Sequence, residues 1–191
     1  LGVGGAKLVD ELGFNPDVYH LNEAHAISSA FYLLEKNNGD LEDLKKKLVF
    51  TTHTPEEAGN EKHDIYLCNK MSYFCGMPLE KVREITGMED DQFNHSLVAL
   101  RFARLSNAVS ELHGHVSRKL WNKYEGICPI IHITNSQNWR YWADKQLYFA
   151  MDEQNDERFI DRKRYLKKRA FDLVADQTGK LMDPDVFTIV W

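Results

Sequence analysis

The chain has little of what marks disulfide-rich, secreted or membrane proteins. Its 191 residues include only three cysteines, Cys68, Cys75 and Cys128, and no two of them form a Cys-x-x-Cys pair. This excludes a disulfide framework or a zinc ribbon and favours a reducing, cytoplasmic setting. The longest apolar runs are far shorter than the roughly 18 residues of a membrane span, and no basic segment followed by an apolar one marks a secretory signal.

An excess of positive charge is also missing. The chain carries 24 basic and 29 acidic residues, for a formal net charge of −5. A mildly acidic protein is not expected to bind nucleic acid or an anionic membrane. At 43% hydrophobic and 12% aromatic residues, the chain has enough apolar side chains for a sizeable core, which predicts one globular domain or parts of two.

Short apolar runs and longer helical patterns alternate along the chain. Predicted strands cover residues 17–21, 48–52, 130–134 and 186–191. Predicted helices cover 26–36, 40–47 and 156–176, a series of short helices with irregular joins in 61–92, and a long helix in 92–123 that Gly114 kinks or divides. This order predicts a helix-rich α/β fold with short parallel strands.

Both ends of the chain indicate a piece of a longer protein. The first residue is Leu1 rather than Met, and the last run, Val186–Trp191, is an apolar β-type segment. A buried parallel strand needs a following crossover to its neighbour. We therefore expect an internal fragment, with a natural C-terminal strand as the alternative.

Polar residues follow three of the predicted strands at the point where each ends. These residues are Asn22, Glu23 and His25; Thr52, His53 and Thr54; and Thr134, Asn135 and Ser136. In α/β folds, ligands bind outside the carboxyl ends of the strands. The pattern therefore predicts a site for a small polar ligand, without specifying which one.

Other chemistries have weaker support. The run His20–His25 has the spacing His-x-x-Glu-x-His, which matches no zinc-protease motif, and no metal site is predicted. His113 and His115 do not share a helix face, so solvent or packing roles are expected. Glu23 is suited to acid–base chemistry, but no second carboxylate completes a glycosidase pair.

Two further segments leave alternatives open. The basic run 162–169 is either a solvated helix face or a surface that faces an anion. The aromatic side chains of Trp139, Tyr141 and Trp142 suit either stacking on a sugar or packing.

Four ordered blocks carry a resemblance to a known family. They are Tyr19–His25, Val49–Pro55, Ser110–Trp121 and His132–Asn135. In this order the chain resembles the α-glucan phosphorylases, the relatives of glycogen, starch and maltodextrin phosphorylase, and especially their bacterial and archaeal branch. The resemblance covers nearly the whole chain.

The resemblance implies a fold, a reaction and a cofactor. Family members have two Rossmann-like α/β domains in the glycosyltransferase B arrangement and cleave α-1,4-glucan with inorganic phosphate to give glucose 1-phosphate. They carry pyridoxal phosphate on a lysine. On this basis residues 1–135 are the C-terminal part of the first α/β domain, and residues 136–191 are the crossover and the start of the second.

The resemblance also assigns roles to individual residues. His25 matches the catalytic-cleft histidine that lies against the glucosyl ring. Asn135 matches an asparagine that hydrogen-bonds a sugar hydroxyl. Asn22 and Glu23 belong to the same cleft-facing, substrate-binding loop, whereas His53 and Thr54 match a block expected to be mainly structural.

The chain departs from the family in two places. Ser136-Gln137-Asn138 stands where the family usually has a glycine-containing turn, and Trp191 comes before the family's phosphate-binding block and cofactor lysine. We therefore expect the isolated chain to be inactive, to bind no cofactor and to self-associate through an exposed domain interface. A nucleotide-sugar-dependent glucan synthase and a non-catalytic carbohydrate-binding module are the alternatives.

Overall fold

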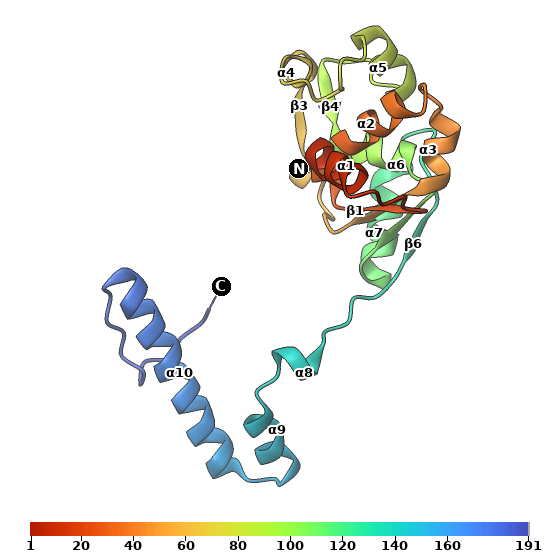
Figure 1. Cartoon of the computed structure of the whole chain (residues 1–191). Helices are drawn as coiled ribbons and strands as arrows, with labels where there is room; N and C mark the ends of the chain where they lie inside the picture. Colours follow the sequence, from red (N-terminus) through yellow and green to blue (C-terminus); the bar gives the residue numbers. More distant parts are fainter. Residues whose placement is uncertain (191) are drawn as a thin grey trace. The chain divides into compact units, whose positions relative to one another are not determined.

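The computed structural model describes residues 1–190 and divides the chain into two compact units (Figure 1). Unit 1 covers residues 1–135, and unit 2 begins at Ser136.

Unit 1 is built on a four-stranded parallel sheet. Its strands are β1 (Tyr19–Asn22), β2 (Leu48–Thr52), β5 (Leu105–Ala108) and β6 (Ile130–His132), in the order β1-β2-β5-β6. A separate antiparallel pair joins β3 (Lys62–Asp64) and β4 (Gln92–Asn94). The helices are α1 (Gly2–Glu11), η1 (Ala24–Ala26), α2 (Ser28–Lys36), α3 (Leu41–Lys47), η2 (Glu57–Gly59), α4 (Ile65–Lys70), α5 (Leu79–Thr86), α6 (His95–Phe102) and α7 (Glu111–Trp121). The helix-rich α/β class predicted from the sequence is confirmed.

The helices gather on one face of the sheet. The four strands lie in the sheet in the same order as in the sequence. Because connections between parallel strands are right-handed, this order places every connecting helix on the same face of the sheet. On that face Leu21, Phe50 and Ile130 are buried. On the opposite face His20 and Asn22 are exposed. The core therefore lies between one side of the sheet and the helices.

The long helix predicted over 92–123 is wrong. This region holds β4, α6, β5 and α7, and β5 lies inside the parallel sheet between β2 and β6. Two side-chain caps start the two helices: Asn94 Oδ1 accepts the Leu97 N–H at 3.0 Å, and Ser110 Oγ accepts the His113 N–H at 3.1 Å. The apolar spacing fits one continuous helix, but the ladder hydrogen bonds of β5 to both neighbours outweigh it.

The short helices predicted in 61–92 are confirmed as α4 and α5, but the prediction missed the β3–β4 pair. Each of these strands has only three residues. Such short strands are defined by their pairing across the ladder rather than by a pattern along the chain.

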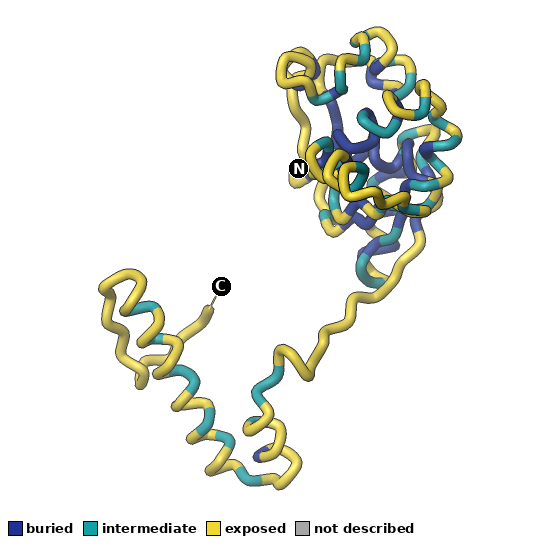
Figure 2. The backbone as a smooth tube through the Cα atoms, in the orientation of Figure 1, coloured by how far each residue is buried: buried dark blue, intermediate teal, exposed yellow. Residues whose placement is uncertain are grey.

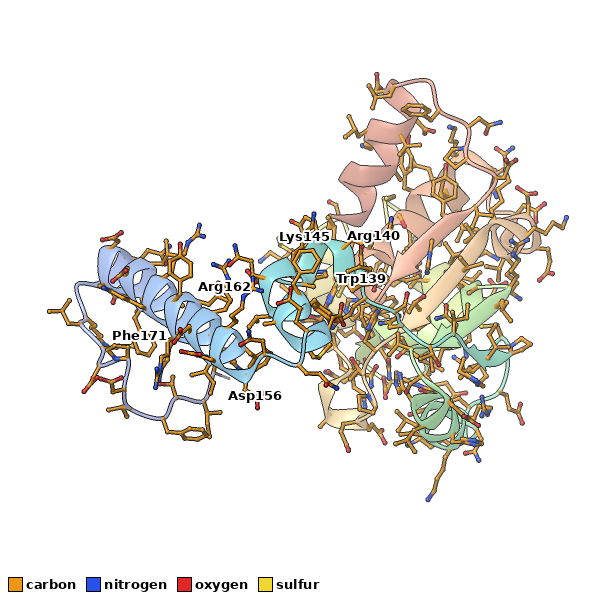
Figure 3. All side chains as sticks on the ribbon, turned by 90° about the horizontal axis from the view of Figure 1, so that it is seen from below. Trp139, Arg140, Lys145, Asp156, Arg162 and Phe171 are labelled. Atoms are coloured by element: carbon orange, nitrogen blue, oxygen red, sulfur yellow. The ribbon has the colours of Figure 1, made fainter. Side chains whose placement is uncertain are left out.

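The described part of unit 2 consists of three helices and an irregular tail. They are α8 (Trp139–Trp142), α9 (Lys145–Asp152) and α10 (Asp156–Thr178). Asp144 caps α9 by accepting the Leu147 N–H at 3.1 Å, and it also binds the guanidinium of Arg162 on α10 through two hydrogen bonds of 3.0 and 2.6 Å. Arg162 is labelled on α10 in Figure 3. This pair of contacts holds α9 against α10 and lowers the pKa of the Asp144 carboxyl.

Unit 2 buries very little. Among its described residues Ala150 is buried, whereas the large side chains of Trp139, Tyr141 and Trp142 are exposed. The backbone of unit 2 is coloured almost entirely as exposed or intermediate (Figure 2). The basic run 162–169 lies on α10. No helix among the described residues has the length and apolar character needed to cross a membrane.

The strand predicted for 186–191 is not present in the described part of that segment. Residues 186–190 are irregular and largely exposed, and Trp191 lies outside the described residues. A strand needs a neighbour for its backbone hydrogen bonds, and the described part of unit 2 contains no other strand.

Candidate functional site

The carboxyl ends of β1 and β2 meet in a network of polar side chains. Glu23 Oε1 accepts the backbone N–H of His53 and the hydroxyl of Thr54, the latter at 3.2 Å. The imidazole Nε2 of His53 lies 2.7 Å from Asn22 Oδ1. The structure thus brings the predicted residues Asn22 and Glu23 into direct contact with the two residues that follow β2.

Glu23 adopts a backbone conformation that few residues other than glycine adopt. Its φ is 63° and its ψ is 171°. Its N–H donates to Thr51 O at 2.9 Å, and its carboxylate is held at the same time by His53 and Thr54. A strained residue persists only where its surroundings fix it, and such residues gather at functional sites.

This strain makes a testable prediction for Glu23. In Glu23→Gly the backbone strain is relieved, whereas in Glu23→Ala the strain stays and the carboxylate hydrogen bonds are lost. We expect the alanine variant to be less stable than the glycine variant by about 1 kcal/mol in denaturant unfolding.

Glu35 is the matched control because it is an exposed residue of α2. There alanine should be more stable than glycine by about 0.5–1 kcal/mol, since helical backbone disfavours glycine. If alanine and glycine rank in the same order at both positions, Glu23 is not strained.

A row of hydrogen bonds ties three strands together beneath this network. His20 Nε2 lies 2.7 Å from the hydroxyl of Thr51, which donates to Asn107 Oδ1 at 2.7 Å. These side chains belong to β1, β2 and β5 in turn. The row fixes the strands relative to one another just before they reach the site.

The end of β5 connects the site to Asn135. His113 Nδ1 accepts the N–H of Val109 at 3.3 Å, and Val109 O accepts the N–H of Asn135 at 2.9 Å. Burial lowers the pKa of His113; the carboxylate of Glu23 opposes this shift and His53 adds to it. The neutral imidazole that accepts a hydrogen bond is therefore favoured, and the packing role expected for His113 fits its buried position.

His25 lies outside this network, in η1. Its side chain is 59% exposed, and its Nδ1 is 3.5 Å from Glu61 Oε2. It lines an open cavity of about 380 Å³ together with Glu61, His63, Leu67, Cys68, Met71, Tyr73 and His95. The structure therefore places Asn22 and Glu23 at one polar network and His25 at the mouth of a neighbouring cavity.

The arrangement suits recognition of hydroxyl groups. Amide, imidazole and hydroxyl side chains from Asn22, His53 and Thr54 offer both hydrogen-bond donors and acceptors. The described residues of this network and of the cavity include no lysine. These residues therefore offer no amine that could hold the aldehyde of pyridoxal phosphate.

Some residues of this region were named in the sequence analysis and others were not. His53 and Thr54 were named among the polar residues that follow a predicted strand, and they contact Asn22 and Glu23 directly. Glu61, His63 and His95 were not singled out, because His63 and His95 are 32 residues apart and only the β3–β4 pairing brings them together. The sequence signal for His53 and Thr54 is their position directly after β2.

Comparisons with known proteins show low sequence identity between this chain and named phosphorylases. An uncharacterised protein of Methanocaldococcus jannaschii is 37% identical over 191 residues, covering 100% of this chain and 36% of that protein. Maltodextrin phosphorylase of Thermococcus litoralis is 33% identical over 166 residues, covering 80% of this chain and 20% of the enzyme. Glycogen phosphorylase of Aquifex aeolicus is 29% identical over 192 residues, covering 92% of this chain and 28% of the enzyme. No family model matches the chain.

These similarities confirm the family resemblance in a coarse form. The chain is distantly related to glycogen and maltodextrin phosphorylases. It spans about a third or less of the length of the relatives named above.

Proposed function

We propose that this chain is part of an α-glucan phosphorylase, which transfers a glucosyl unit from α-1,4-glucan to inorganic phosphate and releases glucose 1-phosphate. The observation that carries the proposal is the meeting of Asn22, Glu23, His53 and Thr54 at the carboxyl ends of a parallel sheet, in a chain related to phosphorylases. This is where α/β folds bind their ligands.

Each predicted site residue receives a role in this proposal. His25, exposed at the cavity mouth, contacts the glucosyl ring that is transferred. Asn22 and Asn135 hydrogen-bond sugar hydroxyls. Glu23 uses its carboxylate to hold the loop after β2, so that it positions the substrate-binding side chains.

The two units correspond to different parts of the longer enzyme. Residues 1–135 form the C-terminal part of its first α/β domain, and residues 136–191 form the crossover and the start of the second. The exposed face of the sheet supports this proposal, because parallel sheets are usually covered on both faces. The exposed aromatic side chains of unit 2 support it as well.

Pyridoxal phosphate is proposed for the longer enzyme, held by a lysine outside this chain. When bound, its phosphate group supplies proton transfer. The residues of this chain bind and orient the sugar.

The test is an assay of the longer gene product that contains this chain. With maltodextrin and phosphate it should release glucose 1-phosphate, and its absorbance spectrum should show bound pyridoxal phosphate. Sulfate in place of phosphate should give no product, and the 191-residue chain alone should be inactive. Glucan extension from a nucleotide sugar, or binding of maltodextrin with no turnover, would contradict the proposal in favour of a synthase or a binding module.

A further inference from the structure

We propose that Glu61, His63 and His95 form a binding site for a divalent transition-metal ion, with Zn²⁺ as the ion whose preferred ligands match. The potential ligand atoms of these three residues all lie within 4.8 Å of one another. Two imidazoles and one carboxylate form a ligand set that zinc uses where a further position stays open.

The β3–β4 pair creates this cluster. His63 belongs to β3, and Glu61 precedes it by two residues, so both side chains fall on the same face of the extended segment. The N–H of His95 donates to Glu61 O at 3.2 Å, which places His95 directly across from Glu61. The ladder thus positions three ligands from two segments that are far apart in the sequence.

The two imidazoles already face one another through their ring nitrogens. His63 Nδ1 lies 2.8 Å from His95 Nε2. Two nitrogens bound to one tetrahedral zinc ion at about 2.05 Å would be roughly 3.3 Å apart. A shift of about half an ångström, within the freedom of the exposed His63 side chain, would replace the shared proton with a metal ion.

Tyr73 supplies the outer contact that metal-binding histidines usually have. Its hydroxyl lies 2.8 Å from His95 Nδ1. A partner at Nδ1 leaves Nε2 free to bind the metal and fixes the ring orientation. The contact therefore leaves His95 with one ring nitrogen directed toward the other two proposed ligands.

The cluster borders an apolar wall. His95 is only 3% exposed, and the side chains of Leu67, Cys68 and Met71 line the same cavity. A hydrophobic shell of this kind limits the access of solvent to a bound ion.

The test uses the full 191-residue chain after dialysis against a chelator. Titration with Zn²⁺ in a calorimeter should show one ion bound per chain at micromolar concentrations, and Zn²⁺ should raise the thermal unfolding midpoint. Co²⁺ should give the visible absorption of a tetrahedral site. Mg²⁺ should not compete, because it prefers oxygen ligands.

Three single-residue variants test whether the ion binds at the proposed site. His63→Gln changes an exposed side chain and should lower the Zn²⁺ affinity at least roughly tenfold, and Tyr73→Phe should lower it by about tenfold. His115→Gln, an exposed histidine on α7, is the matched control and should bind as the wild type does. Circular dichroism verifies that each variant is folded.

Two results would overturn the proposal. The first is a wild-type chain that takes up no Zn²⁺ at micromolar concentrations. The second is equal affinity in the folded His63→Gln and His115→Gln variants, which would place the ion elsewhere.

Discussion

In the longer enzyme proposed above, His25→Ala is expected to lower kcat by about 10²–10³-fold. This is the effect of removing one well-placed hydrogen-bond donor from a transition state in which charge develops. The side chain of His25 is 59% exposed and lines the cavity next to the polar network. Its loss should therefore remove a contact with the sugar rather than a part of the core.

The measurement is steady-state phosphorolysis of maltodextrin, with kcat and KM determined separately. A transition-state contact predicts a fall in kcat that exceeds the change in KM. His115→Ala should leave both constants unchanged, since His115 is exposed on α7. A kcat for His25→Ala within tenfold of the wild-type value would show that His25 is not a catalytic residue.

Phe31→Ala is expected to lower the free energy of unfolding of unit 1 by about 3–5 kcal/mol. Phe31 is 0% exposed at the centre of the core. Its ring packs edge-on against Phe74 at a centroid distance of 4.9 Å and lies 5.8 Å from Phe102 and 6.0 Å from Phe93. Alanine would leave a cavity among aromatic rings that hold α2 and α6 together.

This loss is large because the free energy of unfolding of a typical domain is only about 5–15 kcal/mol. We expect the thermal midpoint of unit 1 to fall by roughly 10–20 °C, measured by circular dichroism of the 191-residue chain. Phe14→Ala is the matched control because Phe14 is 64% exposed; its effect should stay within about 0.5 kcal/mol. Equal effects of the two variants would mean that Phe31 does not organise the core.

Several elements were predicted correctly because their signals are local. The run Leu48–Thr52 forms β2 as predicted. The helix predicted for 40–47 is α3, and Asp40 caps it by accepting the Asp43 N–H at 2.9 Å. The helix predicted for 156–176 is α10. Caps, charge patterns and apolar runs act over one or two helical turns, so the chain reveals them without knowledge of its neighbours.

The residues of the polar network could also be named from the sequence. The parallel arrangement of the strands brings residues after β1 and β2 to the same edge, so Asn22 and Glu23 could be expected near His53 and Thr54. The positive φ of Glu23 could not be predicted. No local pattern requires it, and the hydrogen bonds that maintain it come from residues about 30 positions away.

The fold class, the strand ends that carry polar residues and the distant relation to α-glucan phosphorylases could be predicted from the order of the amino acids. The position of β5 within the sheet and the meeting of Glu61, His63 and His95 depend on contacts between distant segments. Both have the same cause. A short strand and a ligand cluster are stabilised by partners distant in the chain, and local spacing carries no information about those partners.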